Sequence, residues 1–191
     1  MKKSISLIVF ILIAFISINA SAQTSKFIGT WNSQDLPLEN GKFNLCVKLN
    51  ENNEGSVKWT TKANGRNYDY NASFTVIVEM PCYWMDDGAC IYCYLDKSKA
   101  TFSLPKNLVK ITSNNPSVKK QINSIKQEFI QQLEYKSDDL IYDLPETFTW
   151  EIISASSNIL VLSEDGDIVT FTKATGTSGS KSTNKSSKKR K

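Results

Sequence analysis

The stretch FTWEIISASSNILVLSEDGDIVTFTK, residues 148–173, decides the fold because apolar and polar side chains alternate along it in three runs. Such alternation is typical of β-strands with one buried face, and turn residues at 155–157 and at Asp165-Gly166 separate the runs. The predicted inner face consists of Phe148, Trp150, Ile152, Leu160, Leu162, Val169 and Phe171. The predicted cross-strand pairs are Leu162–Val169, Leu160–Phe171, Ile152–Leu160 and Trp150–Leu162.

The same alternation continues through residues 42–49 and 57–78, which predicts three further strands with one shared core face. Asn64-Gly65 tolerates the positive φ angles of a tight hairpin turn, so we place a two-residue turn there. A short loop ending near Gly55 joins the first two of these strands. The predicted pairs are Trp59–Tyr70, Thr61–Tyr68, Val57–Ala72, Val47–Trp59 and Leu49–Val57.

One amphipathic helix interrupts the strands, and we expect it over residues 116–136. Asn115-Pro116-Ser117 is a helix start signal with proline in the first turn. The apolar stripe needs a partner, which is either the outward face of the last strands or one end of a barrel. The stripe consists of Val118, Ile122, Ile125, Phe129 and Leu133. The outward face of the last strands offers Ile153, Ile159, Val161 and Ile168.

Composition divides the chain of 191 residues into three parts. Residues 1–22 combine Lys2 and Lys3, an apolar run and a small-residue cleavage pattern, as in a bacterial secretory signal peptide. Residues 174–191 hold six basic residues and no acid, so we expect a disordered basic tail. The chain's net charge of +4 becomes −4 for residues 23–173, once the two leader lysines and six tail cations are set aside. We therefore expect one domain at residues 23–173, exported to the periplasm or secreted.

Four cysteines in an exported protein favour disulfide bonds. A hairpin turn near residues 86–88 sets Cys82 opposite Cys90, and Cys46 is then left to pair with Cys93. Three pairings are possible in principle. Cys90-Ile-Tyr-Cys93 has the spacing of a redox motif, but its strand-forming residues and the lack of a following helix argue against an oxidoreductase.

The chain has no histidine, which excludes Ser-His-Asp and Cys-His catalysis and His-ligated zinc or haem. Adjacent acids occur at Asp86-Asp87 and Asp138-Asp139, but neighbours of this kind on turns are usually solvated. No set of residues completes a catalytic site. We therefore expect no enzyme activity, no cofactor and no metal site.

Phe27-Ile28-Gly29-Thr30-Trp31, soon after the leader, and Phe171-Thr172-Lys173, at the end of the last predicted strand, resemble the end motifs of the lipocalin and lipocalin-like (calycin) families. In those families G-x-W opens the barrel and a basic residue covers the tryptophan. The resemblance is strongest to the short exported lipocalin-like proteins of Gram-negative bacteria. It implies that Gly29, Trp31 and Lys173 close one barrel end. A lysine on an inner face needs compensation, which a tryptophan face supplies through a cation–π contact.

We therefore expect an all-β protein: an antiparallel lipocalin-like β-barrel of about eight or nine strands with one inserted α-helix. The helix precedes the last three strands, whereas in the resembling families it follows the barrel strands. The expected function is the binding of a small hydrophobic or amphipathic, lipid-like ligand in the barrel cavity. The residues expected to contact it are Trp59, Tyr68, Tyr70, Trp150 and Phe171.

The alternative is a non-catalytic structural or protein-interaction module of the cell envelope with a filled barrel. We expect a monomer that does not bind nucleic acid. The basic tail either is solvated without a dedicated partner or touches anionic envelope lipid.

Overall fold

The computed structural model describes residues 26–175. The signal peptide predicted at residues 1–22 and all but the first two residues of the tail predicted at 174–191 lie outside the described residues. Within the described part, no helix is both long enough and apolar enough to cross a membrane.

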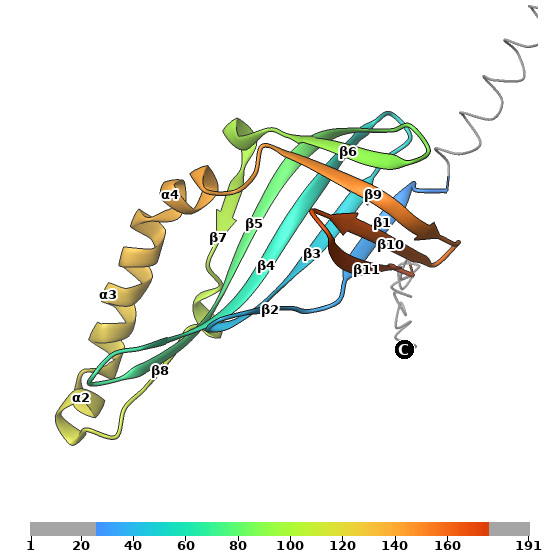
Figure 1. Ribbon diagram of the computed structural model, residues 1–191. Helices are drawn as coiled ribbons and strands as arrows, with labels where there is room; N and C mark the ends of the chain where they lie inside the picture. The colour runs from blue at the N-terminus through green and yellow to red at the C-terminus, as the bar shows by residue number, and fades with distance from the viewer. Residues whose placement is uncertain (1–25, 176–191) are drawn as a thin grey trace, which may run out of the picture.

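Eight antiparallel strands form a closed barrel, which confirms the predicted all-β fold (Figure 1). Neighbours follow the order β1, β11, β10, β9, β6, β5, β4, β3, and β3 returns to β1. The barrel strands are β1 (Gly29–Ser33), β3 (Gly41–Leu49), β4 (Glu54–Arg66), β5 (Asn71–Asp86), β6 (Cys90–Leu95), β9 (Thr147–Ala155), β10 (Ile159–Glu164) and β11 (Asp167–Lys173).

Strands β4 and β5 are longer than the rest and extend as a hairpin beyond the barrel (Figure 1). One edge of β5 pairs with β4, and its other edge is shared by β6, β7 and β8. The short elements around the barrel are β2 (Leu36–Leu38), β7 (Thr101–Ser103), β8 (Lys110–Thr112) and the 3-10 turns η1 (Lys97–Lys99) and η2 (Lys106–Leu108).

The turn of the β4–β5 hairpin lies farther along the chain than the sequence predicts. Asn64 and Gly65 are inside β4, opposite Ser73 and Ala72, and the chain turns where the Asn67 N–H donates to the Tyr70 carbonyl. The predicted pairs of Trp59 with Tyr70, Thr61 with Tyr68 and Val57 with Ala72 are therefore wrong. The observed partners of these three residues are Val78, Val76 and Met80. The later turn gives thirteen paired positions and a longer apolar face, which outweighs the preference of Asn-Gly for a turn.

For the other strands, the sequence predicts correctly which side chains face the core, but some of the predicted cross-strand partners are wrong. The Asp165-Gly166 turn is confirmed, with φ angles of 51° and 92° and with the predicted pairs Leu162–Val169 and Leu160–Phe171. Two other predicted registers are wrong. The observed pairs are Val47–Val57, Leu49–Gly55, Ile152–Leu162 and Ala155–Leu160. A β-bulge between Val161 and Leu162 shifts the β9–β10 register, and sequence alternation does not reveal it.

The helix predicted over residues 116–136 is present as two consecutive segments, α2 (Pro116–Lys120) and α3 (Ile122–Tyr135), and a third segment, α4 (Ser137–Tyr142), continues beyond the predicted end. The Asn115 side chain caps the start by accepting a hydrogen bond from the Ser117 N–H. Helix α3 runs beside the extended β4–β5 hairpin (Figure 1), and Phe129 meets Phe74 of β5 edge-on with 5.2 Å between ring centroids. Phe74 lies on the same face as Trp59, so the helix covers the inner face of the hairpin at a barrel end.

The helix does not cover the outward face of the last strands, which was the other predicted position. Three isoleucines of that face remain about half exposed or more: Ile153 at 52%, Ile159 at 48% and Ile168 at 60%. The inner face of β5 is the better partner because it continues the core cluster, to which the fully buried Ile130 belongs.

One end of the barrel is closed around Trp31, whose side chain is 1% exposed. The indole N–H donates to the Phe27 carbonyl over 2.7 Å, and the Lys173 ammonium lies 5.1 Å from the centre of the Trp31 ring. Gly29 has φ of 140°, and a Cβ atom there would lie 2.5 Å from Cε of Lys173. Glycine thus leaves the space in which the lysine crosses to the ring.

We predict that Trp31→Ala lowers the free energy of unfolding by about 3 kcal/mol, the usual scale for deleting a buried aromatic side chain. Denaturant titration measures the loss. Tyr68→Ala is the control, because Tyr68 is fully exposed at the β4–β5 turn and its removal should change stability little. A loss below about 1 kcal/mol for Trp31→Ala would show that the closed end does not depend on this ring.

Candidate functional site

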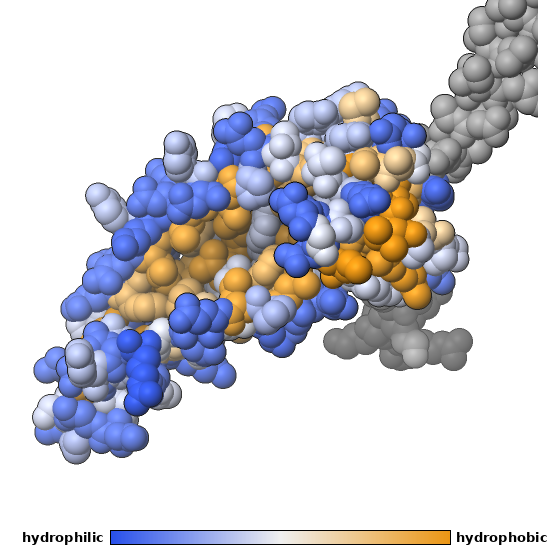
Figure 2. Space-filling model, viewed as in Figure 1, coloured by the Kyte–Doolittle hydropathy of each residue, from blue (hydrophilic) through white to orange (hydrophobic). Residues whose placement is uncertain are grey.

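A cavity of about 560 Å³ opens at the end of the barrel opposite Trp31, a volume in the range of small-molecule sites. Trp31 pairs with Lys173 at the end of β11, whereas the cavity is lined by Asp167, where β11 begins. Figure 2 shows a hollow with hydrophobic walls between helix α3 and the β10–β11 turn, with hydrophilic residues on its rim. The apolar lining consists of Leu36, Pro37, Phe43, Leu45, Trp59, Pro145, Phe148, Trp150, Ile168 and Val169.

Three aromatic rings form one wall of this cavity. Phe148 lies between the other two, with its ring centre 4.7 Å from that of Trp150 and 5.8 Å from that of Trp59. The Phe148 and Trp150 rings are nearly parallel, at an angle of 19°. All three side chains are buried in the core. Their rigid, preformed arrangement gives a ligand apolar contact area at little cost in side-chain entropy.

Glu164 places a carboxylate beside this aromatic wall. Its side chain is half-buried at the end of β10 and accepts a hydrogen bond of 3.2 Å from the indole N–H of Trp150. Burial raises the pKa of the Glu164 carboxyl and the nearby Asp165 adds to the rise, while the bond from Trp150 opposes it. The carboxylate is therefore held in place at some electrostatic cost.

Glu164 and Asp167 both belong to the inner face of the barrel. Glu164 follows Leu160 and Leu162 at every second position of β10, and it pairs with Asp167, which has the same parity on β11 as Val169. Asp165 at the turn also lines the cavity. The inner face predicted from the sequence ends at the last apolar residue of each strand and does not include these acids. Continuing the alternation by one step in each strand would have found Glu164 and Asp167.

The residues predicted to contact a ligand divide into three groups. Trp59 and Trp150 line the cavity. Phe171 lies deeper, beside a void of only about 10 Å³ that Trp31 also borders. Tyr68 is fully exposed and Tyr70 is half-buried at the β4–β5 turn, so neither lines the cavity. The prediction that the two tyrosines lie inside the barrel depends on a turn at Asn64-Gly65. Because the chain does not turn there, this reason to expect the tyrosines at the ligand no longer holds.

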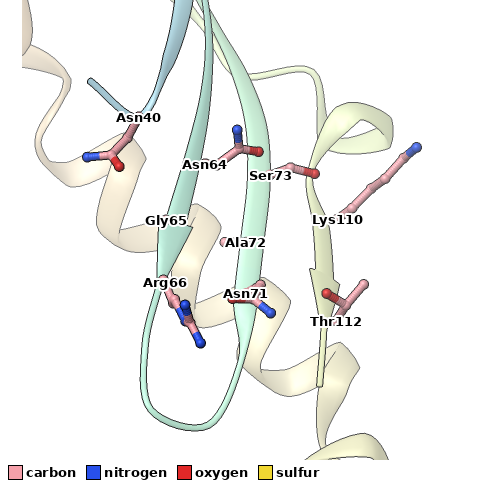
Figure 3. Close-up of a pocket in the computed structure, with 9 residues that line it drawn as sticks. All are labelled: Asn40, Asn64, Gly65, Arg66, Asn71, Ala72, Ser73, Lys110 and Thr112. Atoms are coloured by element: carbon pink, nitrogen blue, oxygen red, sulfur yellow. The ribbon is translucent and has the colours of Figure 1, made fainter. Parts of the chain in front are cut away.

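A second hollow, of about 680 Å³, lies on the β4–β5 hairpin, and Figure 3 shows its lining. Most of its side chains are polar and come from the face of the hairpin that points away from the core. They do not converge: Lys110 extends away from the strands, and Asn64 and Arg66 point in different directions (Figure 3). The side chains of this hollow therefore do not point toward one common position, as they would in a binding site. In the barrel cavity, the aromatic wall provides such a position.

The two predicted disulfide bonds are absent, and all four cysteines are free thiols. Cys82 pairs with Leu95 rather than with Cys90, because the β5–β6 strands continue to Asp86 and Ile91 before they turn. Cys46 is on β3, which is not a neighbour of β6, so Cys93 is out of its reach. Cys93 instead hydrogen bonds to Cys82, and this bond together with burial raises the pKa of the Cys93 thiol. Both thiols are buried in the core.

The adjacent acids noted in the sequence either make local hydrogen bonds or lie exposed on the surface. Asp87 caps the β5–β6 turn by accepting hydrogen bonds from the Ala89 and Cys90 N–H groups and the Tyr92 hydroxyl, and these bonds lower the pKa of its carboxyl. Asp138 and Asp139 are exposed in the first turn of α4. Among residues 26–175, no group of three or more acidic or cysteine side chains is placed to hold a metal ion.

Comparison with known proteins finds no family model, no curated protein and no solved structure that matches the chain.

We predict that Glu164→Gln stabilises the protein at neutral pH. A carboxyl with a raised pKa in the folded state lowers stability as pH rises through the window between its ordinary value of 4.5 and the raised value. Glutamine keeps an acceptor for Trp150 and carries no charge. Thermal unfolding should thus show equal stability for both proteins at low pH and an advantage for the variant at pH 7.

Glu51→Gln is the matched control, since it removes the same charge from an exposed turn. If Glu164→Gln were less stable than the natural protein at pH 7 and Glu51→Gln were not, the carboxylate would contribute stability, contrary to this prediction.

We also predict four reactive thiols when the protein is unfolded without reductant, counted by alkylation and mass spectrometry. In the folded protein Cys82 and Cys93 should be protected, because both are buried, whereas Cys46 and Cys90 are only half-buried. Loss of two or four labels in the unfolded, unreduced protein would reveal disulfide bonds and contradict the free thiols of the structure.

Proposed function

We propose that this barrel binds a small amphipathic molecule at its open end. The observation that carries the proposal is the contrast between the two ends of the interior. The end around Trp31 is filled and leaves about 10 Å³, whereas the other end holds about 560 Å³ beside an aromatic wall. A preformed apolar cavity with a few polar groups on one side is the usual form of a small-molecule site.

We further propose that the protein is an exported, lipocalin-like binding protein that works as a monomer. Export rests on the leader at residues 1–22 and on its small-residue cleavage pattern. The likeness to lipocalins is supported by the placement of Gly29, Trp31 and Lys173, which lie together where β1 closes the barrel. The periplasm or the cell exterior is then where the ligand is met.

A second candidate function is an envelope interaction module with a filled barrel. The tight packing around Trp31 favours it, as do the exposed Ile153 of β9 and Ile159 of β10, which form part of the outer surface. In this function the cavity at the open end has no ligand. The basic tail, or the isoleucine surface, contacts the partner instead.

Titration with N-phenyl-1-naphthylamine, an uncharged apolar dye that fluoresces when sheltered from water, tests ligand binding. We expect saturable binding of one dye per chain. Leu36→Trp should weaken it at least about ten-fold, because a larger side chain on β2 fills the cavity that Leu36 lines. Val169→Trp, from β11, is a second filling variant.

Ile153→Trp is the matched control, because it adds the same ring to the exposed outer surface. It should bind the dye as the natural protein does, and circular dichroism confirms that the variants are folded. Absence of saturable binding, or equal binding by the filled variants, would favour the interaction module.

A further inference from the structure

We propose that the ligand of the barrel cavity carries a positively charged ammonium group next to its apolar part. This inference rests on the proposed binding function and specifies the chemical class of the ligand. It comes from the charges that line the cavity. Of the residues that line it, Glu164, Asp165 and Asp167 are acidic and none is basic.

The three acids have no counter-charge from the protein. The ion pairs among residues 26–175 join Lys42 to Asp35, Lys99 to Asp96 and Lys106 to Glu134, and none of them involves the cavity. The barrel's inner lysine, Lys173, is at the far end of β11 and lies over Trp31. The carboxylates at the open end therefore remain available to a ligand.

Glu164 and the aromatic wall favour the same chemical group. An ammonium ion is attracted both by carboxylates and by the faces of tryptophan and phenylalanine rings. The hydrogen bond from Trp150 holds the Glu164 carboxylate beside the aromatic wall, so a group bound at Glu164 lies next to that wall. Trp59 and Phe148 extend the aromatic surface for the apolar part of the ligand.

Uncharged and anionic ligands fit this cavity less well than a cation does. An uncharged apolar ligand would remove more water from the half-buried Glu164 and offer it no partner. An anionic ligand, such as a fatty acid, would place a fourth negative charge beside the three carboxylates. An alkylammonium offsets the desolvation of Glu164 and uses the apolar wall, so the cavity selects it over molecules of equal size.

Isothermal calorimetry with three eight-carbon probes tests the ligand charge: octyltrimethylammonium, octanol and octanoate. We expect the cation to bind about ten-fold more tightly than octanol, a difference in the range of a partly desolvated cation–π and carboxylate contact. Octanoate should bind most weakly. The preference for the cation should decrease with added salt, whereas octanol binding should not.

The double variant Glu164→Gln, Asp167→Asn should lose the preference for the cation and bind octanol at least as tightly as the natural protein does, because neither of these carboxylates is then desolvated. The double variant Glu51→Gln, Asp69→Asn removes two charges from exposed turns outside the cavity, and should keep the preference. Both variants must give the thermal unfolding of a folded protein.

The outcomes separate this inference from the proposed function. If all three probes bind equally and Leu36→Trp weakens them equally, the cavity binds ligands but the inference of a cation is overturned. If no probe binds, the proposed function itself fails. If octyltrimethylammonium binds only after residues 176–191 are removed, the chain's own basic segment occupies the acidic side of the cavity. The inference that a small cation is the natural occupant is then overturned.

Octylphosphocholine distinguishes a lipid headgroup from a free amine, because it joins the same trimethylammonium group to a phosphate. Binding as tight as that of octyltrimethylammonium would assign the site to headgroups. Binding about ten-fold weaker would assign it to free alkylammonium ions, since the phosphate meets the same carboxylates. Either result, together with weak octanol binding, supports recognition of the ammonium.

Discussion

The contact between Lys173 and Trp31 marks the place where the barrel closes, and the rest of the structure depends on this closure. Strand β1 has only five residues, yet Trp31 pairs with Lys173 of β11 on one side and with Val47 of β3 on the other. Without this short strand the sheet would be open and would expose two edges. The lysine is tolerated on an inner face because its charge lies over an aromatic ring and Gly29 leaves room for its side chain.

Closure at Trp31 also determines where the interior can be hollow. Trp31, Phe171 and their neighbours fill the closed end, so the larger interior volume lies at the other end, beside the β10–β11 turn. The charges of the inner face follow the same axis. Lys173 is at one end of β11 and Asp167 at the other, with Glu164 beside it on β10. The interior therefore differs in charge along the barrel axis: the closed end holds a cation that lies over an aromatic ring, and the open end holds carboxylates without a counter-charge.

Alternation along the sequence predicts the barrel and most of the side chains that face inward, but it fails for Tyr68 and Tyr70 and does not determine strand partners. A shift of two residues leaves the same faces buried, so Val47 opposite Val57 and Val47 opposite Trp59 satisfy the pattern equally well. Asn64-Gly65 has strong turn propensity, but thirteen backbone pairs between β4 and β5 outweigh it. Glu164 was missed because charged residues were assigned to turns. Its burial depends on Trp150, a neighbour that only the folded barrel supplies.

The divided edge of β5 has a consequence for the protein before and after it folds. A strand of 16 residues with one free edge is a template on which another copy of the chain could add a strand. Here β6, β7 and β8 each cover part of that edge, and none of them pairs with more than five residues of it. Three short segments are poor templates individually and can close one after another as the chain collapses. The long hairpin that supports helix α3 is thereby protected against aggregation by its own downstream sequence.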